Sequence, residues 1–381
     1  MSERDVAVAL VRELAQPTPE RRAEVRRLLP SADLHRLLKI LAAQRLVPTL
    51  GGLLLADEEL DLPRDIAEAI QAARLRARQR GLWNYAVTTR LVHTLADAGI
   101  AAVPLKGAAL ADAVYGDLGA RQSSDIDVLV DRSDLDGAVE VAERQGWCEP
   151  ELLKAAGLPR LHRELFHDSL PPLELHWRIH WYEESFAPAA LARAAPLDTM
   201  RLAPADELTS LLLFLARDGF AGLRQAIDVV AWWAALGGDE TAAAVRAIID
   251  AHPPLERAIA TAARYIEDFA GLPRGAIAGE VQLSRRQRAA LRLANPWLVG
   301  SREQIYADVS FVDGLLAPPG GRGAFVGRQL LPPRPVLVRR QPALQGASTT
   351  RVGVARLGHA TRVLARYVLS ASAALARPRA T

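Results

Sequence analysis

Residues 121–130 read RQSSDIDVLV, and this stretch decides the fold because it places Asp125 and Asp127 at the start of a short apolar run. The run predicts a buried strand, a setting in which Asp is disfavoured, and side chains at i and i+2 of a strand point to the same face. Two like charges on one face raise each other's pKa unless a cation lies between them. We expect this cation to be Arg121 or a divalent metal ion bound through oxygen ligands.

The composition is that of a globular protein with two or three folding units. Of the 381 residues, 50% are hydrophobic and 24% are charged, which allows a sizeable core. The one cysteine, Cys148, excludes a disulfide framework and a thiolate-rich zinc or iron–sulfur site. Residues 1–22 carry early charges of both signs and no long apolar run, so we expect neither a signal peptide nor a transmembrane segment. These features predict a cytoplasmic protein.

Charge is distributed unevenly along the chain. Residues 314–381 contain eleven Arg and no Asp or Glu, and since the net charge is +3, the first 313 residues carry about −8. This Arg-rich tail has three possible roles: contact with nucleic-acid phosphates, binding to an anionic membrane as an amphipathic helix around Arg362 and Arg366, or packing against the acidic body. Few aromatic residues are interleaved, which disfavours single-strand stacking, and we favour packing.

Hydrophobic periodicity and turn residues divide the chain into four regions. Residues 1–80 predict a helical region, with a longer helix following from residue 82 to about residue 98. Residues 81–186 predict a small core in the order helix, strand, helix, strand, helix and two paired strands. Residues 187–313 are again helical, and residues 314–381 combine an irregular segment up to about residue 350 with a final helix over 356–376. The predicted fold class is α+β, a small mixed sheet between helical regions.

A third carboxylate, Glu174, lies in the later predicted strand LELHW. If that strand neighbours the strand of Asp125 and Asp127, the three carboxylates form a triad. Mg²⁺ prefers such hard oxygen ligands and keeps waters for a phosphate chain. The triad therefore predicts a site where Mg²⁺ binds an NTP such as ATP and an acceptor hydroxyl attacks with loss of pyrophosphate. Glu174 is then either a third metal ligand or the general base.

The segment before the Asp pair carries donors suited to phosphates. The string LKGAAL places a glycine turn at a helix start, where the backbone N–H groups of Gly107 and Ala108 favour an anion. Lys106, one of only three lysines in the chain, is either a helix-start charge or a phosphate contact. Arg121 and Ser124 are candidates for the same role, and Arg121 has the alternative of being a structural partner of the Asp pair.

Histidines in the strand region make zinc the alternative metal, because imidazole and carboxylate are both zinc ligands. They are His162, His167, His176 and His180. A strand pair lacks the helical face of an HExxH site, and the Asp pair prefers a hard cation, so we favour Mg²⁺. Strand alternation places His176 on the face of Glu174, where it is either a nucleotide contact or a half-buried, hydrogen-bonded residue.

Two pairs in a later predicted helix also have alternative interpretations. Arg224 and Asp228, at i and i+4, are most simply an intrahelical ion pair, with contact to substrate as the alternative. Trp232 and Trp233 favour core packing over a platform for base stacking.

In their order and spacing these motifs resemble the uncharacterised nucleotidyltransferase family of the polymerase-β-like nucleotidyltransferase superfamily. The string LKG, a short helix ending in YGD, RQSSDIDVLV and LELHW carry the resemblance, and flanking helices extend it over residues 33–240. It implies a polymerase-β-like core in which Asp125 and Asp127 are the metal pair and Glu174 is the third carboxylate. Two features depart from the pattern: the turn has Ala108 in place of a serine, and Arg217 and its neighbours replace a frequent histidine.

The activity implied by the resemblance is Mg²⁺-dependent transfer of a nucleoside monophosphate from an NTP to an acceptor, with release of pyrophosphate. We expect the acceptor to be a hydroxyl or phosphate of a small molecule or peptide, bound between the core and the later helices. Two alternatives stay open. The acceptor is RNA or protein, as in toxin-like relatives, or the protein is a non-catalytic nucleotide-binding scaffold, against which the intact triad argues.

Overall fold

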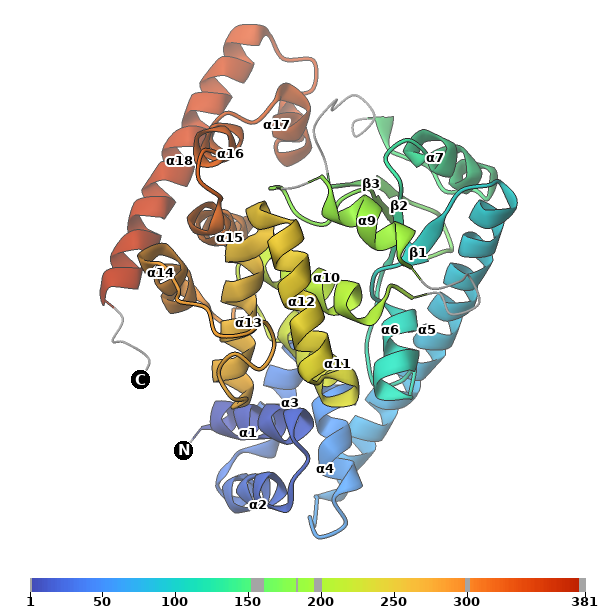
Figure 1. Ribbon diagram of the computed structural model, residues 1–381, viewed down its shortest axis with the longest axis vertical. Coiled ribbons are helices and arrows are strands. Elements are labelled where there is room, and N and C mark those ends of the chain that lie inside the picture. Colours follow the sequence, from blue (N-terminus) through green and yellow to red (C-terminus); the bar gives the residue numbers. More distant parts are fainter. Residues whose placement is uncertain (1, 152–160, 183, 195–200, 299–301, 377–381) are drawn as a thin grey trace.

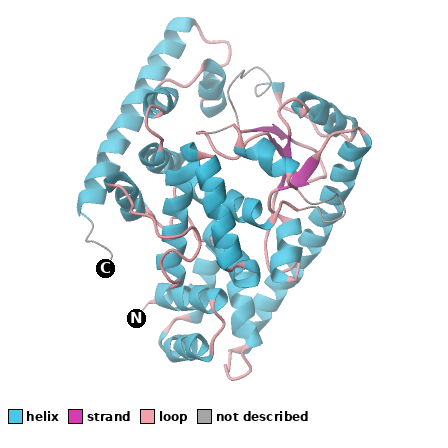
Figure 2. Cartoon of the chain, in the orientation of Figure 1, coloured by secondary structure: helices cyan, strands magenta, loops and turns pink. Residues whose placement is uncertain are grey.

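A small four-stranded sheet lies at one side of a mainly helical molecule (Figures 1 and 2). This computed structural model describes residues 2–151, 161–182, 184–194, 201–298 and 302–376. The arrangement confirms the predicted α+β class. Among the described residues, none of the helices combines the length and the apolarity that a membrane crossing requires.

The sheet has the strand order β1-β2-β4-β3. Its strands are β1 (Ala102–Pro104), β2 (Ile126–Val130), β3 (His162–Leu165) and β4 (Leu173–His176). The outer pairs, β1 with β2 and β4 with β3, are antiparallel, whereas the central pair, β2 and β4, is parallel. The register places Asp127 directly opposite Glu174, so the neighbouring strands that the triad requires are present.

Side chains of β2 alternate between two apolar cores, and the leucines of β4 face one of them. Val128 and Leu175 belong to a smaller core with Trp147 on one side of the sheet. On the other side, Leu129 belongs to the large core made by the helices. Because Asp127 shares the face of Leu129, its carboxylate points toward the helical region rather than toward the smaller core.

The helices before the sheet are α1 (Glu3–Ala15), α2 (Pro19–Leu28), α3 (Leu34–Ala43), α4 (Gly52–Ala56) and α5 (Arg64–Asp97). The two helices expected on either side of Gly81 are in fact the single helix α5, which spans the predicted junction at residues 80–81. Leu118 passes so close to the helix that only glycine fits at position 81: a Cβ there would lie 2.4 Å from the carbonyl oxygen of Leu118. The glycine therefore marks a close approach and not a helix end.

Short helices connect the strands, and longer ones follow the sheet. The connecting helices are α6 (Ala108–Leu110), continued by a helical turn over Ala111–Tyr115, and α7 (Leu135–Arg144). Helix α9 (Phe186–Ala192) follows the last strand. The later helices are α10 (Pro204–Arg217), α11 (Arg224–Leu236), α12 (Asp239–Ala251), α13 (Glu256–Ala270) and α14 (Arg285–Leu293). Helix α1 packs against α11 and α13, so the N-terminal and later helices share one core. Trp232 is fully buried there, and its indole N–H donates to Glu207, which agrees with the packing interpretation.

The Arg-rich tail is more helical than predicted. It contains α15 (Arg302–Leu316, which begins before it), α16 (Arg322–Leu330), α17 (Arg334–Arg340) and α18 (Thr349–Ala376). Helices α16 and α17 lie where we predicted an irregular segment, because each Pro sits at or before a helix start, where it is tolerated. Helix α18 runs along the outer edge of the molecule and packs against α14 to α17, burying Val352 and Val363 (Figure 1). Its opposite face exposes Leu357 and Leu364.

Candidate active site

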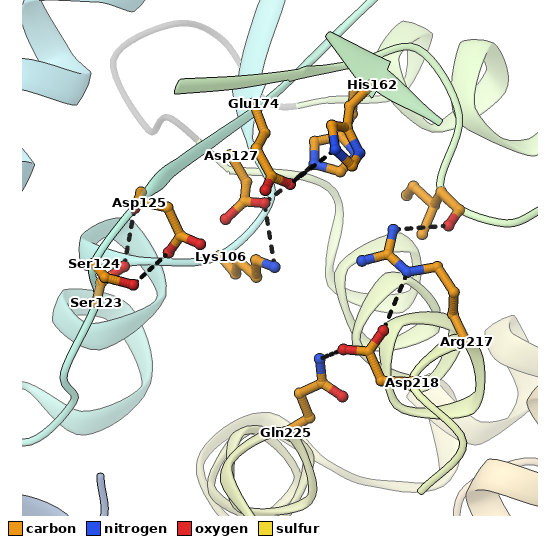
Figure 3. Close-up of polar contacts among 12 residues, drawn as sticks. Lys106, Ser123, Ser124, Asp125, Asp127, His162, Glu174, Arg217, Asp218 and Gln225 are labelled. Atoms are coloured by element: carbon orange, nitrogen blue, oxygen red, sulfur yellow. Dashed lines mark hydrogen bonds and ion pairs between the residues drawn. The ribbon is translucent and has the colours of Figure 1, made fainter. Parts of the chain in front are cut away.

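The three predicted carboxylates lie on one face of the sheet (Figure 3). Asp125 lies one residue before β2, Asp127 lies within it, and Glu174 lies opposite Asp127 on β4. The parallel pairing sets this arrangement, because residues in register on neighbouring strands point to the same side. Asp127 is buried, whereas Asp125 and Glu174 are partly exposed.

Asp127 is held as a buried, ionised carboxylate. Its Oδ1 lies 3.2 Å from Lys106 Nζ and 3.1 Å from His176 Nε2. Burial alone would raise the pKa of Asp127, but the charge of Lys106 and the hydrogen bond from His176 outweigh it and hold the pKa well below its usual range. Its Oδ2 is buried and has no hydrogen-bond partner among the described residues. An unpaired buried carboxylate oxygen is costly unless a cation completes its contacts, so these residues fit a divalent cation.

Glu174 is also ionised and faces two imidazoles. Its Oε2 lies 3.2 Å from His176 Nε2 and 3.6 Å from His162 Nε2. Burial raises the pKa of Glu174, but the contact with His176 and the electrostatic effect of His162 lower it to about 2. Glu174 therefore carries a negative charge at neutral pH.

Polar groups and cations surround Asp125. Ser124 Oγ lies 3.5 Å from Asp125 Oδ1, and Arg45 Nη1 donates to Ser124 Oγ at 3.1 Å. Arg45 follows α3 and has a left-handed backbone with φ of 59°, which a residue other than glycine adopts only when its surroundings impose it. Sequence reasoning missed Arg45, because nothing in the sequence links it to a motif about eighty residues later. Gly107, with φ of 81°, forms the predicted turn before Ala108.

Arg121 forms its ion pair with Asp228 on α11. Its Nε and Nη2 donate to the two carboxylate oxygens at 2.8 Å each, and both side chains are only 4% exposed. Tyr115 also donates to this carboxylate, at 3.4 Å. The intrahelical pair predicted between Arg224 and Asp228 is therefore wrong, because Asp228 is engaged by Arg121. The same contact replaces the structural pairing expected between Arg121 and the Asp pair.

Helices α10 and α11 supply the opposite side of the site. Figure 3 shows Arg217, Asp218 and Gln225 facing Lys106 and the carboxylates. Arg217 packs over the ring of Phe214, with its Cζ 4.6 Å from the ring centroid, and Lys106 Nζ lies 4.3 Å from the same centroid.

The side formed by α10 and α11 contains the position at which the sequence departs from the family pattern. Arg217 and Asp218 lie at this position, and Gln225 Nε2 donates to Asp218 Oδ2. The contact brings together residues from α10 and α11, and Gln225 was not predicted.

A sequence profile of the family described as "uncharacterised nucleotidyltransferase" matches residues 30–271. The chain belongs to this family. The match extends past the predicted limit of residue 240 to include α13, and it covers the four strands together with α10 and α11. No curated protein and no solved structure matches the chain at a significant level. The chain is thus a nucleotidyltransferase, as the resemblance implied.

In this nucleotidyltransferase the four predicted histidines separate into two sets. His162 and His176 meet beside Glu174, whereas His167 accepts hydrogen bonds from the backbone N–H groups of Ser169 and Leu170.

His180 is fully buried outside the carboxylate cluster. Burial, together with the positive charges of Arg217 and Arg178, lowers the pKa of His180 to about 3. Asp313 Oδ1 lies 3.5 Å from His180 Nε2, which favours the charged imidazole but does not outweigh burial. His180 is therefore neutral at physiological pH.

Proposed function

We propose that this nucleotidyltransferase moves a nucleoside monophosphate from an NTP, with ATP the first candidate, to an acceptor and releases pyrophosphate. The observation that carries the proposal is that Asp125, Asp127 and Glu174 share one face of the sheet, with Asp127 Oδ2 buried and unpartnered among the described residues. Such a set of oxygen ligands suits a hard divalent cation.

Mg²⁺ is the cation that we propose for this site, held by Asp125 and Asp127 with Glu174 as a third ligand. When bound, it supplies positive charge to the triphosphate and to the departing pyrophosphate. Strand β2 fixes Asp127, and the low pKa keeps this carboxylate ionised and ready to bind. A general base works best with a pKa near the operating pH, so a pKa of about 2 supports a ligand role for Glu174 over a role as base.

We assign phosphate binding to cations and backbone amides around the carboxylates. Lys106, with the backbone N–H groups of Gly107 and Ala108, lies on the sheet side, and Arg45 approaches through Ser124. On the helix side, Arg217 supplies a guanidinium for the leaving pyrophosphate. Arrangements of this kind neutralise a triphosphate without covalent chemistry by the protein.

The ion pair of Arg121 and Asp228 is a positioning element in this proposal. Both carboxylate oxygens hold the guanidinium, so Arg121 anchors the segment that leads into Asp125 against α11. Arg224 lies in the field of both Arg121 and Asp125, and burial lowers its pKa. Arg224 is the residue of this helix that we assign to substrate contact. His176 is fully buried against Asp127 and Glu174, so we assign it to holding these carboxylates and not to nucleotide contact.

The acceptor is proposed to bind between the sheet and α10–α11, where Asp218 and Gln225 supply polar contacts. We favour a hydroxyl or phosphate group of a small molecule or peptide. An RNA or protein acceptor is the second candidate, and the observation that favours it is the cationic tail, which offers phosphate contacts for nucleic acid. A scaffold without catalysis is the third.

The test incubates the protein with Mg²⁺, each labelled NTP and panels of small-molecule, peptide and RNA acceptors. We expect label transfer by the wild type, loss of transfer in the Asp125→Ala/Asp127→Ala variant, and normal transfer in Asp97→Ala, which removes an exposed carboxylate at the end of α5. Equal transfer by the wild type and the double variant would refute the metal assignment. Binding of Mg²⁺ and NTP by the wild type without transfer to any acceptor would support the scaffold.

A further inference from the structure

Two imidazoles and a carboxylate meet at the β3–β4 side of the sheet. His162 on β3 and His176 on β4 are cross-strand partners, with ring centroids 4.7 Å apart. Glu174 lies two residues before His176 and therefore on the same face. The register of an antiparallel pair brings such residues within reach of one ion without any helical HExxH motif. His176 is fully buried, and the side chains of His162 and Glu174 are 14% and 18% exposed.

The separations between the donor atoms match the edges of a metal coordination shell. Zn²⁺ binds imidazole nitrogen and carboxylate oxygen at about 2.0–2.2 Å, so neighbouring ligands of a tetrahedral site lie roughly 3.3–3.5 Å apart. Glu174 Oε2 lies 3.2 Å from His176 Nε2 and 3.6 Å from His162 Nε2. His176 Nε2 also lies 3.1 Å from Asp127 Oδ1. One atom from each of His162, Glu174 and His176 falls within 4.8 Å of the others.

A hydrogen-bonded arrangement accounts for these contacts less well. His176 Nε2 is almost equally distant from Asp127 and Glu174, yet an imidazole nitrogen carries at most one proton and can direct it well toward only one oxygen. His162 Nε2 lies at a similar range from Glu164 Oε1, at 3.4 Å, and from Glu174 Oε2. One cation among these atoms satisfies both imidazole lone pairs and the carboxylate together.

We propose that His162, His176 and Glu174 bind one divalent transition-metal ion of the Zn²⁺ class, with Asp127 as the nearest further oxygen ligand. Imidazole suits zinc, cobalt, nickel and iron, whereas Mg²⁺ takes oxygen ligands, so this ion is chemically different from the Mg²⁺ assigned to Asp125 and Asp127, and Glu174 is a ligand that the two sites share. Two His and one acidic residue form a ligand set that leaves a coordination position open. The ion also fixes the orientation of Glu174, whichever acceptor the enzyme uses.

The test measures metal binding on the full-length, metal-free protein without nucleotide. Co²⁺ is added while its visible absorption is recorded, and Zn²⁺ binding is measured by calorimetry. We expect one ion per chain and intense tetrahedral Co²⁺ bands that Zn²⁺ removes. His162→Gln should weaken binding at least about 10–100-fold, the loss seen when even an outer partner of a metal ligand is removed. His167→Gln, which changes a histidine outside the cluster, should bind as the wild type does.

Two outcomes would overturn the inference: the wild type binds no stoichiometric Co²⁺ or Zn²⁺, or His162→Gln and His167→Gln bind with equal affinity. Circular dichroism checks that each variant is folded, and Glu174→Gln gives the same expected loss by an independent change. Asp125→Asn separates this inference from the proposed function. It should abolish nucleotidyl transfer while changing the Co²⁺ affinity less than about twofold, because it removes no ligand of this ion.

Discussion

The buried pair of Arg121 and Asp228 gives the sharpest test of how the site is positioned, through the variant Asp228→Asn. The substitution keeps the shape of the side chain but leaves the Arg121 guanidinium charged in a place where both residues are only 4% exposed. Two charge-assisted hydrogen bonds of 2.8 Å are affected, each worth about 1.5–3 kcal/mol. Removing one partner of a buried ion pair costs about 3–5 kcal/mol, and the two magnitudes agree.

The free energy of unfolding, measured by urea titration, checks this value. The double variant Arg121→Met/Asp228→Leu should recover most of the loss, because an apolar pair of similar size leaves no charge buried. Asp250→Asn is the matched control: it breaks the i,i+4 pair with Arg246 on α12, whose side chains are 42% and 62% exposed, and should cost at most about 0.5 kcal/mol. A loss below about 1 kcal/mol in Asp228→Asn, or additive losses in the double variant, would refute the reasoning.

Three further predictions concern other parts of the fold. His180 has a pKa of about 3 when folded and about 6.5 when unfolded, so the unfolded chain binds the proton at a higher pH. The free energy of unfolding should therefore fall as the pH drops from about 6.5 to 3, by up to about 4–5 kcal/mol. Urea titrations at pH 7 and pH 4.5 should show a smaller loss of stability in His180→Leu than in the wild type, and equal losses would contradict this. Gly81→Ala should lower the melting temperature, because its Cβ would lie 2.4 Å from the Leu118 carbonyl oxygen. Gly353→Ala on α18, where a Cβ would meet no atom within 4 Å, should be neutral or stabilising by up to about 1 kcal/mol. The opposite order of melting temperatures would refute the packing argument. Arg45→Ala should weaken Mg²⁺–NTP binding about 10-fold in calorimetry, about 1.4 kcal/mol, and unchanged affinity would remove Arg45 from the phosphate site.

The parts of the site that sequence reasoning located were those with a local pattern. An apolar run after Asp125 and Asp127 marks a strand, and alternation within LELHW places Glu174 and His176 on one face. The distance between the two motifs in the chain did not matter, because a short buried strand has few neighbours available in a small sheet. The parallel pairing of β2 with β4 then brought the carboxylates together.

Local sequence patterns could not predict ion pairs between residues far apart in the chain. Asp228 has Arg224 at i−4, which satisfies the helical pairing rule, yet its carboxylate is taken by a guanidinium 107 positions earlier in the chain. The tertiary pair wins because it is buried and bidentate, whereas an intrahelical pair contributes only a few tenths of a kcal/mol. A local rule names an available partner, and burial decides between competing partners.

The cations around the proposed metal site are fixed by packing. Leu129 of β2 belongs to the same apolar core as Leu41 of α3 and Phe214 of α10, the helices that position Arg45 and Arg217. A close-packed core admits discrete arrangements and resists gradual deformation, so both guanidinium groups are held near the carboxylates before any nucleotide arrives. Nucleotide binding then requires little ordering of the protein, and more of the binding energy remains for orienting the α-phosphate toward the acceptor. We therefore expect acceptor selectivity to be set on the side formed by Asp218 and Gln225, because Asp218 belongs to the segment where the sequence departs from the family pattern.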